Sequence, residues 1–138
     1  MKRFGSKTQK IGKKAEEAVV RYLKSQEFHI IEENYTQHRI GEIDIITKKE
    51  STIHFIEVKS IRIFVPHETS VSEVIQKSYN PAENLTKEKY QKIYKTAMHF
   101  LKNTKVSYET FVIDLYIVYF DEQNNKFYIK IIENVIVS

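Results

Sequence analysis

Apolar residues recur every three to four positions in two long segments, which predicts two amphipathic helices. The first helix covers residues 12–26 and the second covers residues 86–102. A shorter helix is predicted over residues 71–77, within an irregular segment that contains both prolines. The apolar face of the first helix consists of Ile11, Ala15, Ala18, Val19, Tyr22 and Leu23. The polar face of the helix at 86–102 carries Lys92, Lys95, His99 and Lys102.

Runs rich in β-branched and aromatic residues predict five strands. They cover residues 28–34, 39–47, 53–60, 110–120 and 127–137. The polar residues 48–52 can turn the chain, so the strands at 39–47 and 53–60 are expected to form a hairpin. The main elements then follow the order α-β-β-β-α-β-β. This order favours an α/β fold in which the helices cover a mixed sheet.

Length and composition restrict the class of protein. A chain of 138 residues is long enough for one domain with its own core. It contains no cysteine, which excludes disulfide scaffolds, cysteine nucleophiles and cysteine-based zinc sites. No apolar run approaches the roughly 20 residues that span a bilayer. The N-terminus lacks the apolar stretch of a secretory signal. We therefore expect a cytoplasmic protein with no membrane partner.

The net charge of +4 is unevenly distributed. Residues 1–14 contain six basic residues and no acidic residue, so the remaining 16 basic and 18 acidic residues leave a charge of −2. We expect a flexible basic arm at residues 1–11, followed by a single domain at 12–138. Such an arm attracts the phosphate backbone of nucleic acids without reading sequence. A solvated tail that aids solubility is the alternative interpretation.

Three ionisable residues interrupt apolar strands. Asp44 lies among isoleucines, and Glu57 and Lys59 flank a valine. Residues two apart in a strand share a face, so Glu57 and Lys59 point the same way. The predicted hairpin would bring Asp44 near Glu57. Because an acid in an apolar strand costs free energy unless it has a partner, we expect a divalent cation, Mg²⁺ or Mn²⁺, between the two carboxylates.

This group has the minimum chemistry for phosphodiester hydrolysis. A divalent cation lowers the pKa of a bound water and offsets charge that grows on the phosphate. Lys59 would orient or activate the water, or neutralise that charge. Glu16, at the edge of the first helix's apolar face, would add an outer ligand. The alternative is a solvated strand face or a cross-strand ion pair.

Two motifs resemble the signature of a known family. Residues 41–46 (GEIDII) and 55–59 (FIEVK) resemble those of the YraN family, small bacterial proteins of the restriction-endonuclease-like superfamily that are related to Holliday-junction resolvases. Residues 12–16, 81–89 and 113–115 resemble other stretches of the same family. The resemblance implies a restriction-endonuclease-like α-β-β-β-α-β core, with a mixed central sheet flanked by helices.

The resemblance also implies roles for individual residues. Asp44 and Glu57 would be metal ligands, Lys59 the catalytic base or charge stabiliser, and Glu16 the acid on the helix. Glu42 matches a family position whose role is less clear, and Lys89 matches a recurrent lysine that suits a phosphate contact. Together with the basic arm and helix face, the expected nucleic-acid contacts are Lys13, Lys14, Lys89, Lys92 and Lys95.

Several further residues have a structural and a functional interpretation. His67 lies in a loop that can approach the site, but a surface position is favoured. His99 is expected to contact phosphate or solvent. Asp114 interrupts an apolar strand and is expected to be a buried structural acid. The aromatic residues suit base stacking, but their spacing favours packing in the core.

Two hypotheses of function follow. The first is a metal-dependent nuclease that acts on DNA, with branched or otherwise structured DNA as the expected substrate. The second is a non-catalytic nucleic-acid-binding protein on the same fold, and a protein-interaction adaptor is a more remote third. A junction presents two symmetric cuts, so a resolvase-type activity would favour a homodimer.

Overall fold

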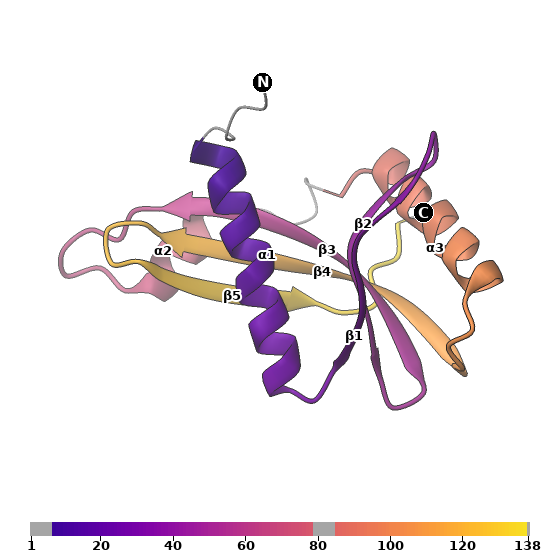
Figure 1. The fold of residues 1–138 in the computed structure, drawn as a ribbon. Coiled ribbons are helices and arrows are strands. Elements are labelled where there is room, and N and C mark those ends of the chain that lie inside the picture. Colours follow the sequence, from indigo (N-terminus) through magenta and orange to yellow (C-terminus); the bar gives the residue numbers. More distant parts are fainter. Residues whose placement is uncertain (1–6, 79–84, 138) are drawn as a thin grey trace, which may run out of the picture.

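The computed structural model describes residues 7–78 and 85–137, and within them three helices flank one five-stranded sheet (Figure 1). Along the chain the elements are α1 (Lys7–Ser25), β1 (His29–Gln37), β2 (Gly41–Lys49), β3 (Thr52–Ile63), α2 (Val71–Ser78), α3 (Lys87–Asn103), β4 (Thr110–Asp121) and β5 (Lys126–Ile132). Every predicted helix and strand is present, with bounds that differ by a few residues.

The largest differences in bounds are at the end of the last strand, which stops at Ile132 rather than at residue 137, and at the start of the first helix. Helix α1 begins at Lys7 rather than at residue 12, and Ile11, in its second turn, is buried. Residues 7–11 are therefore helical, because Ile11 extends the apolar face by one more turn. Residues 1–6 of the expected basic arm lie outside the described residues, and for them the arm stays a prediction.

The strands follow one another across the sheet in chain order, β1-β2-β3-β4-β5. All neighbouring strands are antiparallel except β3 and β4, which are parallel. Parallel strands need a long crossover connection, and the segment with α2 and α3 provides it. The predicted hairpin of β2 and β3 is confirmed, with Ile45 opposite Ile56. The result is a mixed α/β fold that is consistent with a restriction-endonuclease-like core.

Two apolar clusters hold the layers together. Helix α1 packs on one face of the sheet, where Val19 and Leu23 are completely buried against Ile45 and Ile56. Helix α3 packs on the other face together with α2 and the larger cluster around Phe55. No helix in the described part of the chain combines the length and apolarity needed to cross a membrane.

Strand β2 departs from regular alternation near Asp44. Ile43 packs in the cluster beneath α3, but Ile45 packs in the cluster beneath α1, although residues two apart normally share a face. The hydrogen-bonded register of β2 with β3 also ends at Ile45 and Ile56. Beyond this point the two strands separate, and the irregularity places Asp44 at the opening between them.

Candidate functional site

The centre of the candidate site is a pair of carboxylates on β2 and β3. Oδ2 of Asp44 accepts a 2.8 Å hydrogen bond from the backbone N–H of Val58, which holds the aspartate beside β3. Asp44 and Glu57 line the same cavity, close enough for Glu57 to influence the protonation of Asp44. Glu57 is almost fully buried, with 7% of its side chain exposed. The expected convergence of these two acids is therefore what the geometry shows.

The surroundings of Asp44 change its protonation. Burial, followed by the hydrogen bond and the charge of Glu57, raises the pKa of Asp44 to about 8, although the Val58 N–H acts in the opposite direction. Two carboxylates this close resist simultaneous ionisation, so the pair retains a proton near neutral pH unless a cation is bound. The arrangement therefore favours binding of positive charge.

Two lysines supply positive charge on the α3 side of the pair. Nζ of Lys89, in the first turn of α3, lies 2.5 Å from Oε2 of Glu57. Lys59 follows Glu57 by two positions in β3. Burial and the neighbouring Lys89 lower the pKa of Lys59, while Glu57 and Asp44 oppose that shift. The acid pair and the two amines thus form one electrostatic unit.

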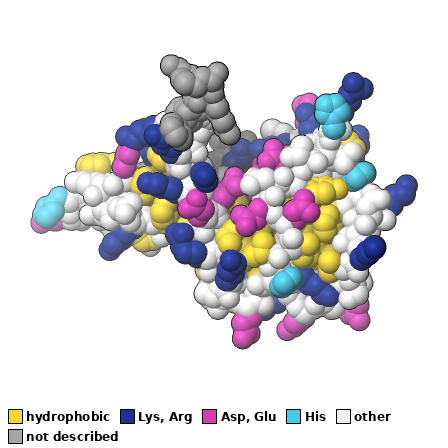
Figure 2. Space-filling view, in the orientation of Figure 1, with side chains coloured by type: hydrophobic (Ala, Val, Ile, Leu, Met, Phe, Trp, Pro, Cys, Tyr) yellow, Lys and Arg dark blue, Asp and Glu magenta, His cyan; other side chains and the backbone are white. Residues whose placement is uncertain are grey.

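The opposite side of the site is acidic. Glu16 projects from α1 and is partly buried; burial, followed by the charges of Glu42, Glu33 and Glu57, raises its pKa. Glu42 is exposed at the start of β2. Figure 2 shows acidic side chains gathered near the middle of this face of the molecule, with lysine and arginine side chains on either side. The site thus has an acidic wall and a basic wall.

A cavity of about 320 Å³ opens between these walls. Residues of α1, β2, β3 and α3 surround it: Glu16, Gly41, Glu42, Asp44, Glu57, Val58, Lys89, Lys92 and Ile93. Of the predicted catalytic residues, Glu16, Asp44 and Glu57 line the cavity. Lys59 does not line it directly, but it interacts with Lys89 and with both carboxylates of the pair.

The donor set suits a hard cation with few protein ligands. Mg²⁺ is commonly bound by one or two carboxylates and keeps several waters. Asp44 and Glu57 could supply the two carboxylates. Within residues 7–78 and 85–137, no group of three or more acidic or histidine side chains is arranged to hold a metal ion. Glu16 lines the same cavity, and its expected role as an outer ligand stays a prediction.

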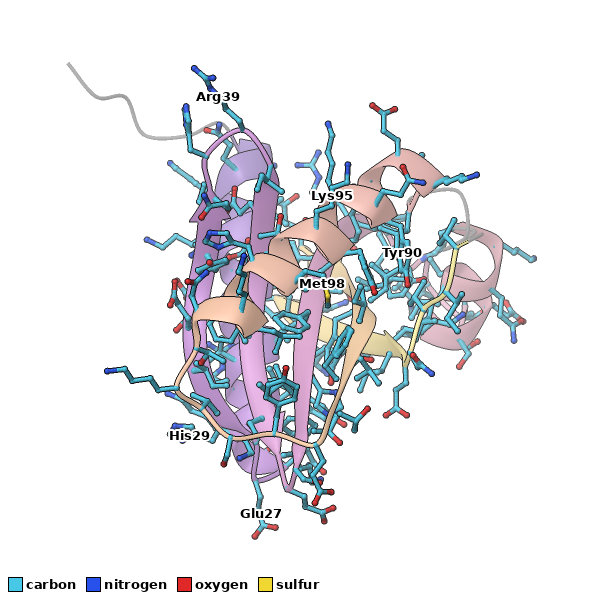
Figure 3. The ribbon with its side chains drawn as sticks, turned by 90° about the vertical axis from the view of Figure 1, so that its right-hand side faces the viewer. Glu27, His29, Arg39, Tyr90, Lys95 and Met98 are labelled. Atoms are coloured by element: carbon cyan, nitrogen blue, oxygen red, sulfur yellow. The ribbon has the colours of Figure 1, made fainter. Side chains whose placement is uncertain are left out.

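The structure separates the other predicted nucleic-acid contacts into two groups. Lys89 and Lys92 line the cavity. Lys13 and Lys14 are exposed on α1 and do not line it, and Lys95 also lies outside it, on the outer side of α3 (Figure 3). The basic helix face therefore meets the site only at its N-terminal end.

The remaining candidates have structural surroundings. His67 is exposed in the loop after β3 and does not line the cavity. His99 is partly buried rather than fully solvated, and its Nδ1 lies 2.8 Å from the hydroxyl of Tyr35; the expected phosphate contact stays a prediction. Asp114 is a buried structural acid, as predicted, and accepts hydrogen bonds from Nδ1 of His54 (2.7 Å) and from the backbone of Asn134 (2.9 Å).

Sequence reasoning gave no role to Gly41, which lines the cavity. A Cβ at this position would lie 2.9 Å from Oγ1 of Thr96 and 3.4 Å from the carbonyl oxygen of Lys92. The glycine therefore allows β2 to approach α3 closely, next to the basic wall. A glycine at the start of a β-branched run was the available signal, because glycine in a strand often marks close backbone approach.

The chain matches the sequence profile of one protein family and resembles individual members of that family along most of its length. The sequence profile of the uncharacterised protein family UPF0102 matches residues 15–121. A UPF0102 protein of Campylobacter lari is 39% identical over 124 residues, which cover 90% of this chain and 91% of the relative. A UPF0102 protein of Sulfurovum sp. is 32% identical, and the match covers 90% of this chain and 91% of the relative. A UPF0102 protein of Campylobacter hominis is 36% identical, and the match covers 96% of this chain and 98% of the relative.

Proposed function

The chain belongs to the UPF0102 family, which is the YraN family that its motifs resemble, and we propose that it is a metal-dependent nuclease that hydrolyses phosphodiester bonds in DNA. The observation that carries the proposal is the convergence of Asp44 and Glu57 in one cavity, where Lys89 pairs with Glu57 and Lys59 lies close enough to interact with both acids. Carboxylates from two strands beside a lysine of the same strand supply the groups that this hydrolysis requires.

Each residue of the site has a task in the proposed reaction. A divalent cation between Asp44 and Glu57 would supply an activated water and offset charge on the phosphate. Lys59 orients the water or accepts its proton, because its lowered pKa favours the neutral amine more than in an ordinary lysine. Lys89 and Lys92 bind the non-bridging oxygens of the phosphate from the basic wall. Glu16 holds water at the opposite rim.

The proposed substrate is recognised by shape and backbone. The cations that line the cavity are lysines, and lysine contacts to phosphate position DNA without reading its sequence. The resemblance to junction-cutting relatives leads us to propose branched DNA as the preferred form. A homodimer would then place two sites on one junction.

A cleavage assay with Mn²⁺ tests the proposal on junction, flap and linear DNA. Wild-type protein is expected to cut the branched substrates. Asp44→Asn should abolish cleavage while DNA binding is retained or becomes tighter, because one negative charge is removed. Glu17→Gln removes an exposed acid beside Glu16 that does not line the cavity, so this control should retain cleavage. Equal cleavage rates for wild type and Asp44→Asn would refute the assignment.

One observation favours a second candidate, a non-catalytic nucleic-acid-binding protein. Among the described residues the acid pair has no third acidic or histidine side chain arranged with it to hold a metal. In this alternative the lysines would bind phosphate, and the acids would only position them. Salt-sensitive DNA binding without cleavage in Mg²⁺ or Mn²⁺ would select this candidate over the nuclease.

A further inference from the structure

The ammonium group of Lys89 occupies the side of the acid pair that faces α3. It lies 2.5 Å from Oε2 of Glu57, whose side chain is 7% exposed. Asp44 is already bound on its other side by the N–H of Val58. A lysine that pairs with a nearly buried carboxylate supplies the compensation that an isolated buried charge would lack. The same carboxylate is the ligand required for a divalent cation in the proposed function.

The ammonium group and a divalent cation compete for one position. Both are positive, and both would neutralise Glu57 at close range. A doubly charged ion at the pair repels an ammonium group only a few ångströms away. Lys59 adds a further positive charge from the same side. The cation therefore binds most favourably when the Lys89 ammonium group has moved off Glu57.

The attachment of Lys89 to α3 allows this movement. Its backbone N–H donates a 3.1 Å hydrogen bond to Oγ1 of Thr86, the N-cap residue of the helix. This bond fixes the start of the side chain at the cavity wall. The side chain itself is 41% exposed and has a flexible four-carbon stem, so its end can turn away from Glu57 into the open cavity while its base stays in place. Lys92 lines the same wall one helical turn later.

We propose, on the premise of the metal-dependent nuclease, that Lys89 is an exchangeable counter-ion of the acid pair. In the cation-free protein its ammonium group pairs with Glu57. When a divalent cation binds, the ammonium group leaves Glu57 and turns into the cavity. There it lies beside Lys92 as a ligand for the substrate phosphate. Lys89 is thus a positioning residue that couples cation binding to substrate binding.

This proposal predicts opposite effects of one substitution on two ligands. Lys89→Met keeps the length of the side chain but removes the competing charge. Mn²⁺ binding, measured by calorimetry on the full chain without DNA, should become at least about fivefold tighter. Binding of branched DNA in Ca²⁺ should become weaker, because a phosphate contact is lost. A residue that only supports the fold would weaken both.

Two variants serve as matched controls for the calorimetry. Lys92→Met removes the same charge from the same wall, but Lys92 forms no ion pair with either acid within the described part of the chain, so its Mn²⁺ affinity should change less than twofold. Lys89→Arg keeps the charge and should bind Mn²⁺ about as wild type does. Unfolding curves followed by circular dichroism verify that each variant is folded.

A measurement on the wild-type protein complements the variants, in case Lys89→Met fails to fold. With ¹⁵N-labelled lysine, the ammonium resonance of Lys89 should shift during a titration with Mg²⁺, whereas that of exposed Lys95 should not. Unchanged or weaker Mn²⁺ binding by folded Lys89→Met overturns the exchange while leaving the nuclease proposal intact. Absence of Mn²⁺ binding to the wild type and every variant overturns both, since the site then holds no cation.

Discussion

The carboxylate of Asp44 accepts a hydrogen bond from the backbone N–H of Val58, the residue that follows Glu57. The ladder between β2 and β3 ends at Ile45 and Ile56, two residues before Val58 in β3. The side chain of Asp44 therefore satisfies a backbone donor that the separating strands no longer pair. This bond places the aspartate beside Glu57. The site therefore begins where the pairing of β2 with β3 ends.

The protonated acid pair should make stability depend on pH in the absence of divalent cations. The unfolded chain releases the proton of Asp44 near its usual pKa of 3.8, whereas the folded chain keeps it until about pH 8. The folded state therefore binds more protons between these values, and the free energy of unfolding falls as the pH rises. At roughly 1.4 kcal/mol for each pH unit, we expect a loss of up to about 4 kcal/mol between pH 5 and pH 8.

Urea unfolding in EDTA at several pH values measures this loss. Asp44→Asn provides the reference, because it retains a hydrogen-bond acceptor for Val58 but has no titrating group. The difference between the two proteins should shrink as the pH falls toward 5. A difference that is independent of pH would show that the pair does not share a proton.

Replacing Gly41 should move β2 away from α3. The new Cβ of Gly41→Ala meets Oγ1 of Thr96 at 2.9 Å, and that hydroxyl already donates to the carbonyl of Lys92. We expect a loss of stability of about 1–3 kcal/mol from overpacking, together with weaker DNA binding. Thermal unfolding and a DNA-binding titration measure the two effects.

A double variant tests the contact that underlies this effect. Thr96→Ala removes the hydroxyl that the new methyl group meets, so Gly41→Ala should cost less in this background than in the wild type. Strict additivity of the two substitutions would mean that the strain lies elsewhere in β2.

Removing Asp114 should damage the fold but not the candidate metal site. The carboxylate is 1% exposed and accepts hydrogen bonds from His54 and Asn134, so Asp114→Ala leaves two donors without this acceptor. We expect a loss of about 3 kcal/mol in unfolding free energy and an unchanged Mn²⁺ affinity. Asp114→Asn keeps one acceptor oxygen and should lose less. Reduced Mn²⁺ affinity without loss of stability would identify Asp114 as a ligand.

Lys92 and Lys95, two of the exposed lysines of α3, should differ in their contribution to DNA binding. Lys92 lines the cavity, whereas Lys95 lies one turn further along on the outer side of the helix. Lys92→Ala should weaken binding and reduce the slope of log affinity against log salt by about one, as expected for one lost phosphate contact. Lys95→Ala should change the slope less. Equal changes would place the DNA along the whole helix rather than at the cavity.

Much of the fold followed from patterns along the chain. The 3.6-residue period of α1 and α3, and the β-branched runs of β2, β3 and β4, predicted these elements because burial of one side requires them. The polar turn before β3 predicted the hairpin, and with it the approach of Asp44 to Glu57. The family motifs singled out the same residues.

Three features of the site depend on contacts between distant segments. The break in alternation at Asp44 arises where β2 leaves β3, and local propensity carries no signal of it. The pairing of Lys89 with Glu57 joins residues 32 positions apart in the chain, brought together by the packing of α3 on the sheet. The role of Gly41 depends on the same packing, and so does the contact between His99 on α3 and Tyr35 on β1.

The sequence alone thus determined which elements form, which residues interrupt them, and which acids are candidates for chemistry, because these follow from short-range periodicity and the cost of placing charge in an apolar strand. Only the tertiary structure decided which amine meets which carboxylate, and which wall of the cavity is basic. Those outcomes depend on how helices pack across a sheet. This packing decides which side chains from separate elements come into contact and which opposite charges pair.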